Sequence, residues 1–124
     1  MAIIRNSITQ VLVRPGTIFN AKITTPKIKM DNFQAAHFNI ISGDGATKTL
    51  TAQIYGAREG KESIMLREAE ITIGGNTDTI IVVAARELCH HELDSAYLVI
   101  PNGQAADKLG TIFAVLTNER YAEG

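Results

Sequence analysis

Apolar and polar residues alternate with a period of two along most of the chain, and β-branched residues are abundant. This pattern is typical of strands whose two faces meet different surroundings. Residues 8–14 predict a first strand that ends at the turn dipeptide of residues 15–16, and residues 17–25 predict a second extended segment. Residues 27–30 predict a short edge strand, because Pro26 removes a backbone donor and lysines on an edge discourage unwanted pairing.

The middle of the chain carries the clearest strand signals. Residues 33–42 predict a strand that leads through a glycine-rich hairpin turn into a return strand over residues 47–55. Residues 63–73 predict two short strands, with a bulge between them as a further option. The nearly continuous apolar run at residues 77–84 is typical of a core strand covered on both faces.

The rest of the chain predicts one short helical turn near residues 85–92, followed by strands over residues 97–100 and 109–117. The expected fold class is therefore all-β: an antiparallel β-sandwich or jelly-roll-like barrel of about eight or nine short strands. We expect residues 1–124 to form a single domain. Residues 1–6 are either an N-terminal arm that orders against a neighbour or an ordinary first strand.

Composition and charge restrict the partners. Lys and Arg number 12 against 13 Asp and Glu, giving a net charge of −1, and no basic stripe is present to bind nucleic acid directly. The apolar start is too short for a signal peptide, and no apolar run reaches the roughly 18 residues of a membrane span. The single cysteine excludes an internal disulfide and suits synthesis in a reducing cytoplasm.

Cys89, His90, His91 and Glu92 form the densest cluster of side chains that could bind a metal or act in catalysis. Neighbouring side chains point apart on a strand or helix, and no second Cys or His pair exists, so three ligands do not converge. The same geometry argues against a Cys89 nucleophile with a histidine base. We therefore predict no catalytic residue, no metal and no cofactor, with Cys89 packed in the interior and both histidines at the surface.

What remains exposed is expected to be strand edges and loop tips, so contact with other protein subunits is the economical function. The candidates for protein contact are the apolar residues Phe19, Met30 and Met65, together with Ile3 and Ile4 in the N-terminal segment. The alternative for each is that it fills the core of this domain.

Two stretches resemble a known group of proteins. Residues 35–60 (AAHFNIISGDGATKTLTAQIYGAREG) and residues 82–103 (VVAARELCHHELDSAYLVIPNG) resemble segments of small β-sandwich head decoration proteins of tailed bacteriophages, also called auxiliary capsid or cement proteins. The chain departs from their pattern at residues 57–61 (AREGK), where a tryptophan-containing loop would be expected.

The resemblance implies a virion protein that is made in the host cytoplasm. It would bind the major capsid protein on the outer surface of the capsid and stabilise the shell. Homo-oligomers, such as trimers, would increase the overall affinity through avidity. Three alternatives stay open. The first is a tail, neck or fibre-associated subunit, the second is a carbohydrate- or ligand-binding sandwich, and the third is an enzyme that uses the Cys89 cluster.

Overall fold

A computed structural model of the chain describes the backbone of residues 2–30, 33–101 and 105–122, and the side chains of residues 9–30, 33–101 and 109–117. The described residues form nine strands and one short helix. The elements are β1 (Ala2–Phe19), β2 (Ile23–Thr24), β3 (Ile28–Lys29), β4 (Ala35–Ser42), β5 (Lys48–Ala57), β6 (Ile64–Ile73), β7 (Asp78–Ala84), α1 (Ala85–Cys89), β8 (Ser95–Ile100) and β9 (Ala105–Ala122). Within this part of the chain, no helix has the length and apolar character that a membrane crossing requires.

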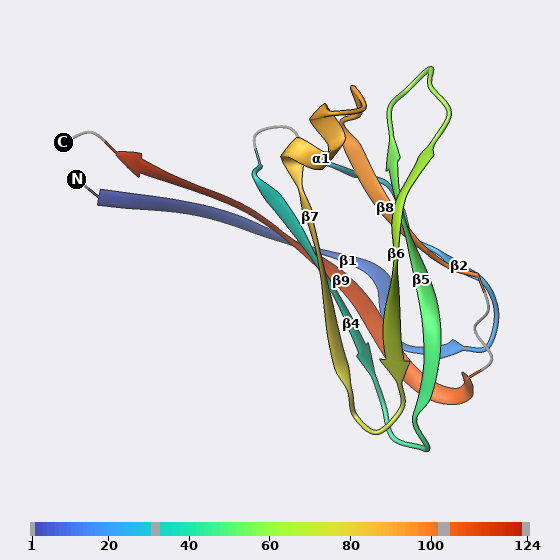
Figure 1. The fold of residues 1–124 in the computed structure, drawn as a ribbon. Helices are drawn as coiled ribbons and strands as arrows, with labels where there is room; N and C mark the ends of the chain where they lie inside the picture. The colour runs from blue at the N-terminus through green and yellow to red at the C-terminus, as the bar shows by residue number, and fades with distance from the viewer. Residues whose placement is uncertain (1, 31–32, 102–104, 123–124) are drawn as a thin grey trace.

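The strands form two antiparallel sheets that pack face to face (Figure 1). The four-stranded sheet has the order β1-β9-β4-β7, and the five-stranded sheet has the order β2-β8-β5-β6, with β3 also pairing with β8. The predicted antiparallel β-sandwich with one short helix is thereby confirmed. The barrel alternative is wrong, because the described strands remain in two separate sheets.

The core lies between the sheets and follows from the alternation seen in the sequence. Along β4 every second residue is buried, with Phe38 and Ile40 at its centre. Ile54 of β5 and Leu98 of β8 face them from the five-stranded sheet. Because inward positions are apolar on both sheets, burial of these side chains supplies the main stabilisation of the fold.

The predicted end of the first strand at Pro15-Gly16 is wrong, since β1 continues through it to Phe19. The register with β9 moves from Val13 opposite Ile112 to Thr17 opposite Gly110, so the dipeptide forms a bulge. Gly16 supplies the positive φ of 86° that this bulge needs. A bulge and a turn use the same residue types, and here the partner strand decides between them.

The predicted hairpin at residues 43–47 is also wrong, because β4 and β5 belong to different sheets. The chain thus crosses between the sheets from β4 to β5, and it crosses back from β6 to β7. The two connections lie side by side: Gly75 N–H donates to the Gly45 carbonyl at 2.9 Å, and Asn76 N–H donates to the Gly43 carbonyl at 3.0 Å. Buried Ser42 accepts a hydrogen bond from the Gly74 N–H at 2.8 Å. The two crossings thus bond to each other and close one end of the sandwich.

β1 and β9 extend beyond the body as a two-stranded ribbon (Figure 1). β4 accompanies β9 only as far as Ala35 opposite Thr117, whereas β1 and β9 stay paired out to Ala2 opposite Ala122. Residues 2–6 therefore belong to the first strand. That they contact a neighbouring subunit stays a prediction.

Candidate interaction surface

The outward side of the four-stranded sheet carries three of the seven large hydrophobic residues that are exposed on the described surface. Its exposed members include Val11 (59% exposed), Ile80 (55%) and Val82 (43%). They lie in register, since Asn39 of β4 is opposite both Ile80 and Phe113, and Phe113 is opposite Val11. We call this surface the apolar face. It comprises the outward side chains of Thr9, Val11, Ala35, His37, Asn39, Ile41, Asp78, Ile80, Val82, Thr111, Phe113, Val115 and Thr117.

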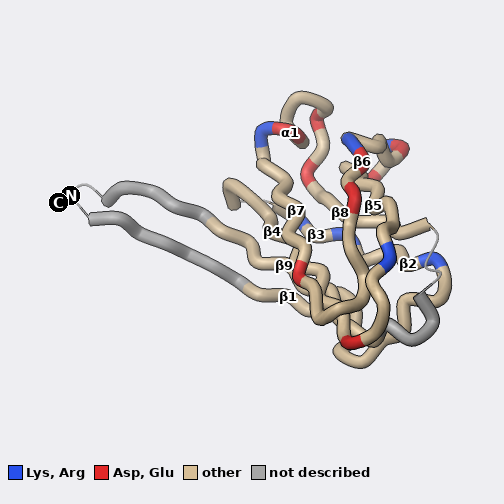
Figure 2. Tube along the Cα trace, turned by 60° about the horizontal axis from the view of Figure 1, so that its bottom comes forward, with Lys and Arg blue, Asp and Glu red and all other residues tan. Residues whose placement is uncertain are grey.

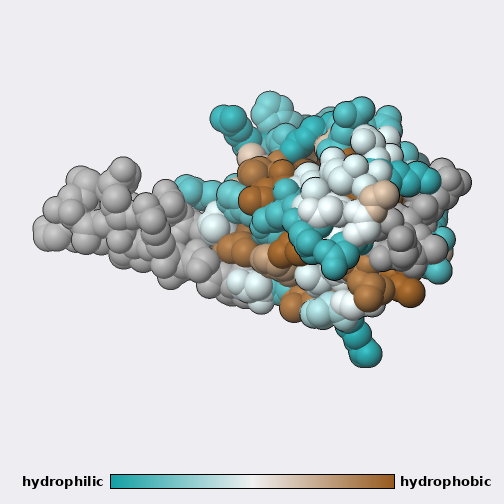
Figure 3. Space-filling view, turned by 90° about the horizontal axis from the view of Figure 1, so that it is seen from below, coloured by the Kyte–Doolittle hydropathy of each residue, from teal (hydrophilic) through white to brown (hydrophobic). Residues whose placement is uncertain are grey.

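The apolar face is almost without charge. Neither β4 nor residues 109–117 of β9 contain Asp, Glu, Lys or Arg, and Asp78 is the only residue of those four types among the members of the face. His37 lies near the centre, with its Nε2 3.5 Å from the Thr117 hydroxyl. Many of the charged positions gather instead around α1 and β6 (Figure 2), and hydrophobic groups are visible on the body close to the ribbon (Figure 3).

The outward side of the five-stranded sheet is different in character. Thr49 and Thr51 of β5 are exposed there, and Thr51 lies opposite Glu70, while Gln53 lies opposite Glu68. Its aromatic pair, Tyr55 and Tyr97, stacks at 5.3 Å between ring centroids. The outward side of the five-stranded sheet is thus polar, as a solvated surface usually is, whereas the outward side of the four-stranded sheet is mainly apolar.

The apolar face corrects the prediction for residues 77–84. β7 is an edge strand, and its inward residues Ile81 and Val83 are buried while Ile80 and Val82 are exposed. β7 is therefore apolar on both of its sides, although the rest of this chain covers only one of them. This mismatch is typical of a surface that a partner covers.

The predicted contact residues fall in different places. Phe19 is fully buried (0% exposed), and Met30 is buried in the same core, so the expectation that these two are exposed tips is wrong. The ring of Phe19 packs over Gly110, where a Cβ would lie only 2.6 Å from its Cε2 atom. Met65 of β6 is 44% exposed and available for contact, but it lies in the other sheet.

Ile3 and Ile4 lie in the ribbon, opposite Tyr121 and Arg120 of β9. Their side chains are outside the described residues. Sequence reasoning missed Val11, Ile80 and Val82, although the apolar run at residues 77–84 carried the signal for the last two.

The cysteine–histidine cluster has no convergent geometry in the described part of the chain. Cys89 is exposed, which corrects the expectation of a packed thiol, and His90 and His91 are exposed as well. The Glu92 carboxylate pairs with the Lys61 ammonium group at 3.2 Å. Among the described residues, no three His, Cys, Asp or Glu side chains lie close enough together to hold a metal ion.

A hollow of about 620 Å³ lies at one end of the five-stranded sheet. It is lined by side chains of both charges, among them Lys27, Lys29, Arg58, Glu59 and Asp94. Because side chains of both charges line it, the hollow does not favour one class of ligand, and we assign no binding site to it.

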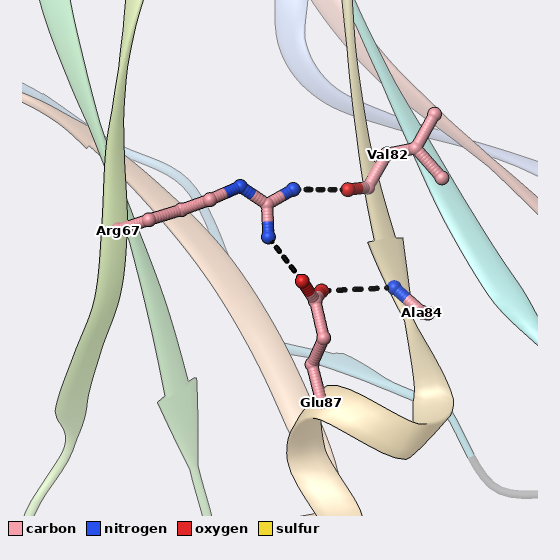
Figure 4. A network of polar contacts seen from close by, with 4 residues as sticks. All are labelled: Arg67, Val82, Ala84 and Glu87. Carbon is pink, nitrogen blue, oxygen red and sulfur yellow. Dashed lines mark hydrogen bonds and ion pairs between the residues drawn. The ribbon is translucent and has the colours of Figure 1, made fainter.

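The edge of β7 is covered by a side chain from the other sheet (Figure 4). The Arg67 guanidinium of β6 donates one hydrogen bond to the Val82 carbonyl and another to Glu87 Oε1, the latter at 2.5 Å. The second oxygen of Glu87 accepts the N–H of Ala84 at 3.1 Å, which ties α1 to the end of β7. This network occupies a backbone carbonyl at which another strand could otherwise pair.

No protein-family model matches the sequence, and no curated protein matches it significantly. Among solved structures, the SPBc2 prophage-derived protein YomS has a similar fold, with a TM-score of 0.60 at 8% identity, covering 93% of this chain and 96% of that chain. This similarity concerns the fold alone.

Two further structures are similar with TM-scores below 0.5, which support no inference. One is of Bacillus endospore appendages that form disulfide-linked pili, with a TM-score of 0.47, 11% identity and coverage of 96% of this chain and 89% of that one. The other is of infectious bursal disease virus Gx strain, with a TM-score of 0.48, 13% identity and coverage of 91% and 32%.

Proposed function

We propose that this chain is a structural protein of a phage particle, which binds the outside of the capsid as a decoration or cement subunit and stabilises the shell. The observation that carries the proposal is the apolar face, an exposed and nearly uncharged sheet surface that contains Val11, Ile80 and Val82. Surfaces of this kind in a folded domain mark sites of protein contact. On this proposal the chain acts by contact and is not an enzyme.

Three further points support a virion role. The sequence resembles phage head decoration proteins over residues 35–60 and 82–103, and the fold is similar to that of a prophage-derived protein. A net charge of −1 allows many copies to pack closely on a lattice without strong mutual repulsion.

The proposed partner is the major capsid protein, and the proposed location is the capsid surface. Attachment of each copy to several capsid subunits, or clustering of copies as a trimer, raises the overall affinity through effective concentration. A tail, neck or fibre-associated subunit is the alternative, since the same face could dock onto another virion protein.

The test measures binding of the purified protein to assembled, expanded phage heads and to unassembled capsid subunits encoded by the same genome. We expect binding to the heads only, because a cement subunit recognises the surface that assembly creates. Equal failure with heads and subunits would contradict the decoration role, and binding to isolated tails would favour the alternative.

A pair of matched variants tests whether the apolar face makes this contact. Ile80→Asp/Val82→Asp places two charges on the apolar face, whereas Thr49→Asp/Thr51→Asp places two on the outward side of the five-stranded sheet. All four positions are exposed, so both variants should fold. We expect loss of head binding in the first variant only, and an equal loss in both would rule out the apolar face as the docking surface.

A further inference from the structure

Three of the four edges of the two sheets carry features that prevent another strand from pairing. Arg67 occupies the Val82 carbonyl on β7. β6 carries Arg67, Glu68 and Glu70 and a bulge, seen where Ile54 pairs with Arg67 but Tyr55 with Met65. β2 and β3 are only two residues long each. Charged side chains, bulges and short strands are the usual protections of an exposed sheet edge.

The fourth edge, formed by β1, has none of these protections over residues 6–11, which lie between Arg5 and the register shift at Val11/Val13. β1 is the end strand of the four-stranded sheet, and among the described residues it pairs with β9 alone. The register is unbroken from Ala2 opposite Ala122 to Val11 opposite Phe113. Residues 6–13 (NSITQVLV) contain no charged residue and no proline, and they are rich in β-forming types.

The ribbon at the start of β1 contains only two strands. Beyond Thr117 it consists of β1 and β9 only, because the pairing of β4 with β9 ends there. A sheet of two strands is marginally stable in water, and three or more strands are needed for independent stability. The uncharged edge of β1 at residues 6–13 therefore adjoins the two-stranded ribbon of residues 2–6, which would gain stability from an added strand.

We propose that two copies of this chain pair through β1, antiparallel and about a two-fold axis, so that their four-stranded sheets join into one sheet of eight strands. A second copy suits this edge because each copy brings the same unfilled edge and the same two-stranded ribbon. One contact then satisfies both, and each ribbon gains a neighbouring strand from the other copy. Antiparallel pairing of identical strands is self-complementary, as a two-fold interface requires. The pairing does not depend on the virion role.

Edge pairing also leaves the apolar faces of the two copies free. Because the added strand lies beside β1 in the plane of the sheet, the exposed side chains of Val11 and Ile80 are not covered by it. The pair would present a joined apolar surface twice as wide as that of one copy.

The test compares two double variants in strands at opposite edges of the same sheet. Thr9→Lys/Val11→Lys puts lysines on β1, and Ile80→Lys/Val82→Lys puts them on β7. Both pairs are two residues apart and exposed, with Val11 and Ile80 at 59% and 55%. Circular dichroism and thermal unfolding establish that each variant is folded.

Sedimentation velocity over a range of concentrations measures the dissociation constant of the pair. We expect a wild-type dimer, a dissociation constant raised at least about tenfold by Thr9→Lys/Val11→Lys, and little change for Ile80→Lys/Val82→Lys, because lysines on a strand oppose pairing at its edge. Hydrogen–deuterium exchange of the wild type should show protection of residues 6–13 that rises with protein concentration.

Each other outcome overturns the proposal. A wild-type protein that stays monomeric at the highest concentration at which it remains dispersed has no β1 pairing. Equal weakening by both variants means that the copies pack through the apolar face. Failure to bind phage heads, by contrast, would leave the dimer measurements unaffected and would concern only the proposed function.

Discussion

Gly56 offers a sharp test of the packing at the helical end of the sandwich. It lies buried within β5, between Ile64 of β6 and Ala96 of β8. A Cβ at this position would lie 2.6 Å from Leu93 Cδ1 and 3.0 Å from Leu88 Cδ2. Both leucines are buried where the chain leaves α1 towards β8, so Gly56→Ala forces at least one of them to move.

The expected cost follows from what the new methyl group meets. Overpacking a well-packed core costs about 1–3 kcal/mol. We expect about 2 kcal/mol for Gly56→Ala, because both contacts are the ends of flexible side chains and not backbone atoms. For a domain of this size the corresponding fall in Tm is about 8 °C.

A double-mutant cycle with Leu93→Ala isolates the contact. Leu93→Ala alone should destabilise by about 2–5 kcal/mol, because it leaves a cavity. In the double variant the alanine methyl occupies part of that cavity, so the loss should be smaller than the sum of the two by about 1–2 kcal/mol. Urea denaturation measures all four free energies of unfolding.

Gly60→Ala provides the control for this cycle. Its φ is +81° and nothing lies within 4 Å of the added Cβ, so it should cost about 1 kcal/mol through backbone strain alone. It should show no coupling to Leu93→Ala. If Gly56→Ala and Leu93→Ala turn out additive, the reasoning from the close approach of Leu93 to Gly56 is refuted.

Two further predictions concern residues that sequence reasoning placed differently or missed. Phe19→Ala should lower the free energy of unfolding in urea by about 3–5 kcal/mol, because the ring is fully buried over Gly110, whereas Met65→Ala should change it by no more than about 0.5 kcal/mol; similar losses in both would contradict these placements. Arg67→Met should cost only about 1 kcal/mol, since both side chains of the ion pair with Glu87 are more than a third exposed, yet sedimentation should reveal larger assemblies through the uncovered edge of β7. An unchanged size distribution would argue against the protective role of Arg67.

The strands themselves could be predicted from the sequence, because alternation is a local property. The strand predicted at residues 33–42 is β4. Residues 63–73, predicted as two short strands with a bulge as an option, form the single strand β6 with a bulge at Leu66, so the two-strand prediction is wrong. What could not be predicted is the partner of each strand. Gly43 and Gly45 have the composition of a hairpin turn, but whether the return strand joins the same sheet depends on contacts distant in sequence.

The misplacement of Phe19 has the same physical origin. A turn at Pro15-Gly16 would have ended the strand and placed Phe19 in a separate segment with its own partner, whereas pairing with β9, about a hundred residues further along the chain, keeps Phe19 within β1. The apolar face was misread for a related reason. The run at residues 77–84 reports that both sides of β7 are apolar, but it does not say whether this chain or a partner covers the second side.

The pairing of β1 with β9 also sets an order on synthesis. β1 leaves the ribosome before the other eight strands and β9 leaves after them, so β1 stays without its neighbour until all the elements between them have been made. Contacts between such distant segments form slowly, and an unpaired apolar strand on a nascent chain invites wrong association with other chains. The hairpin of β5 and β6 joins two consecutive strands, which can pair as soon as both have been made. Pairing within the five-stranded sheet can therefore begin earlier during synthesis.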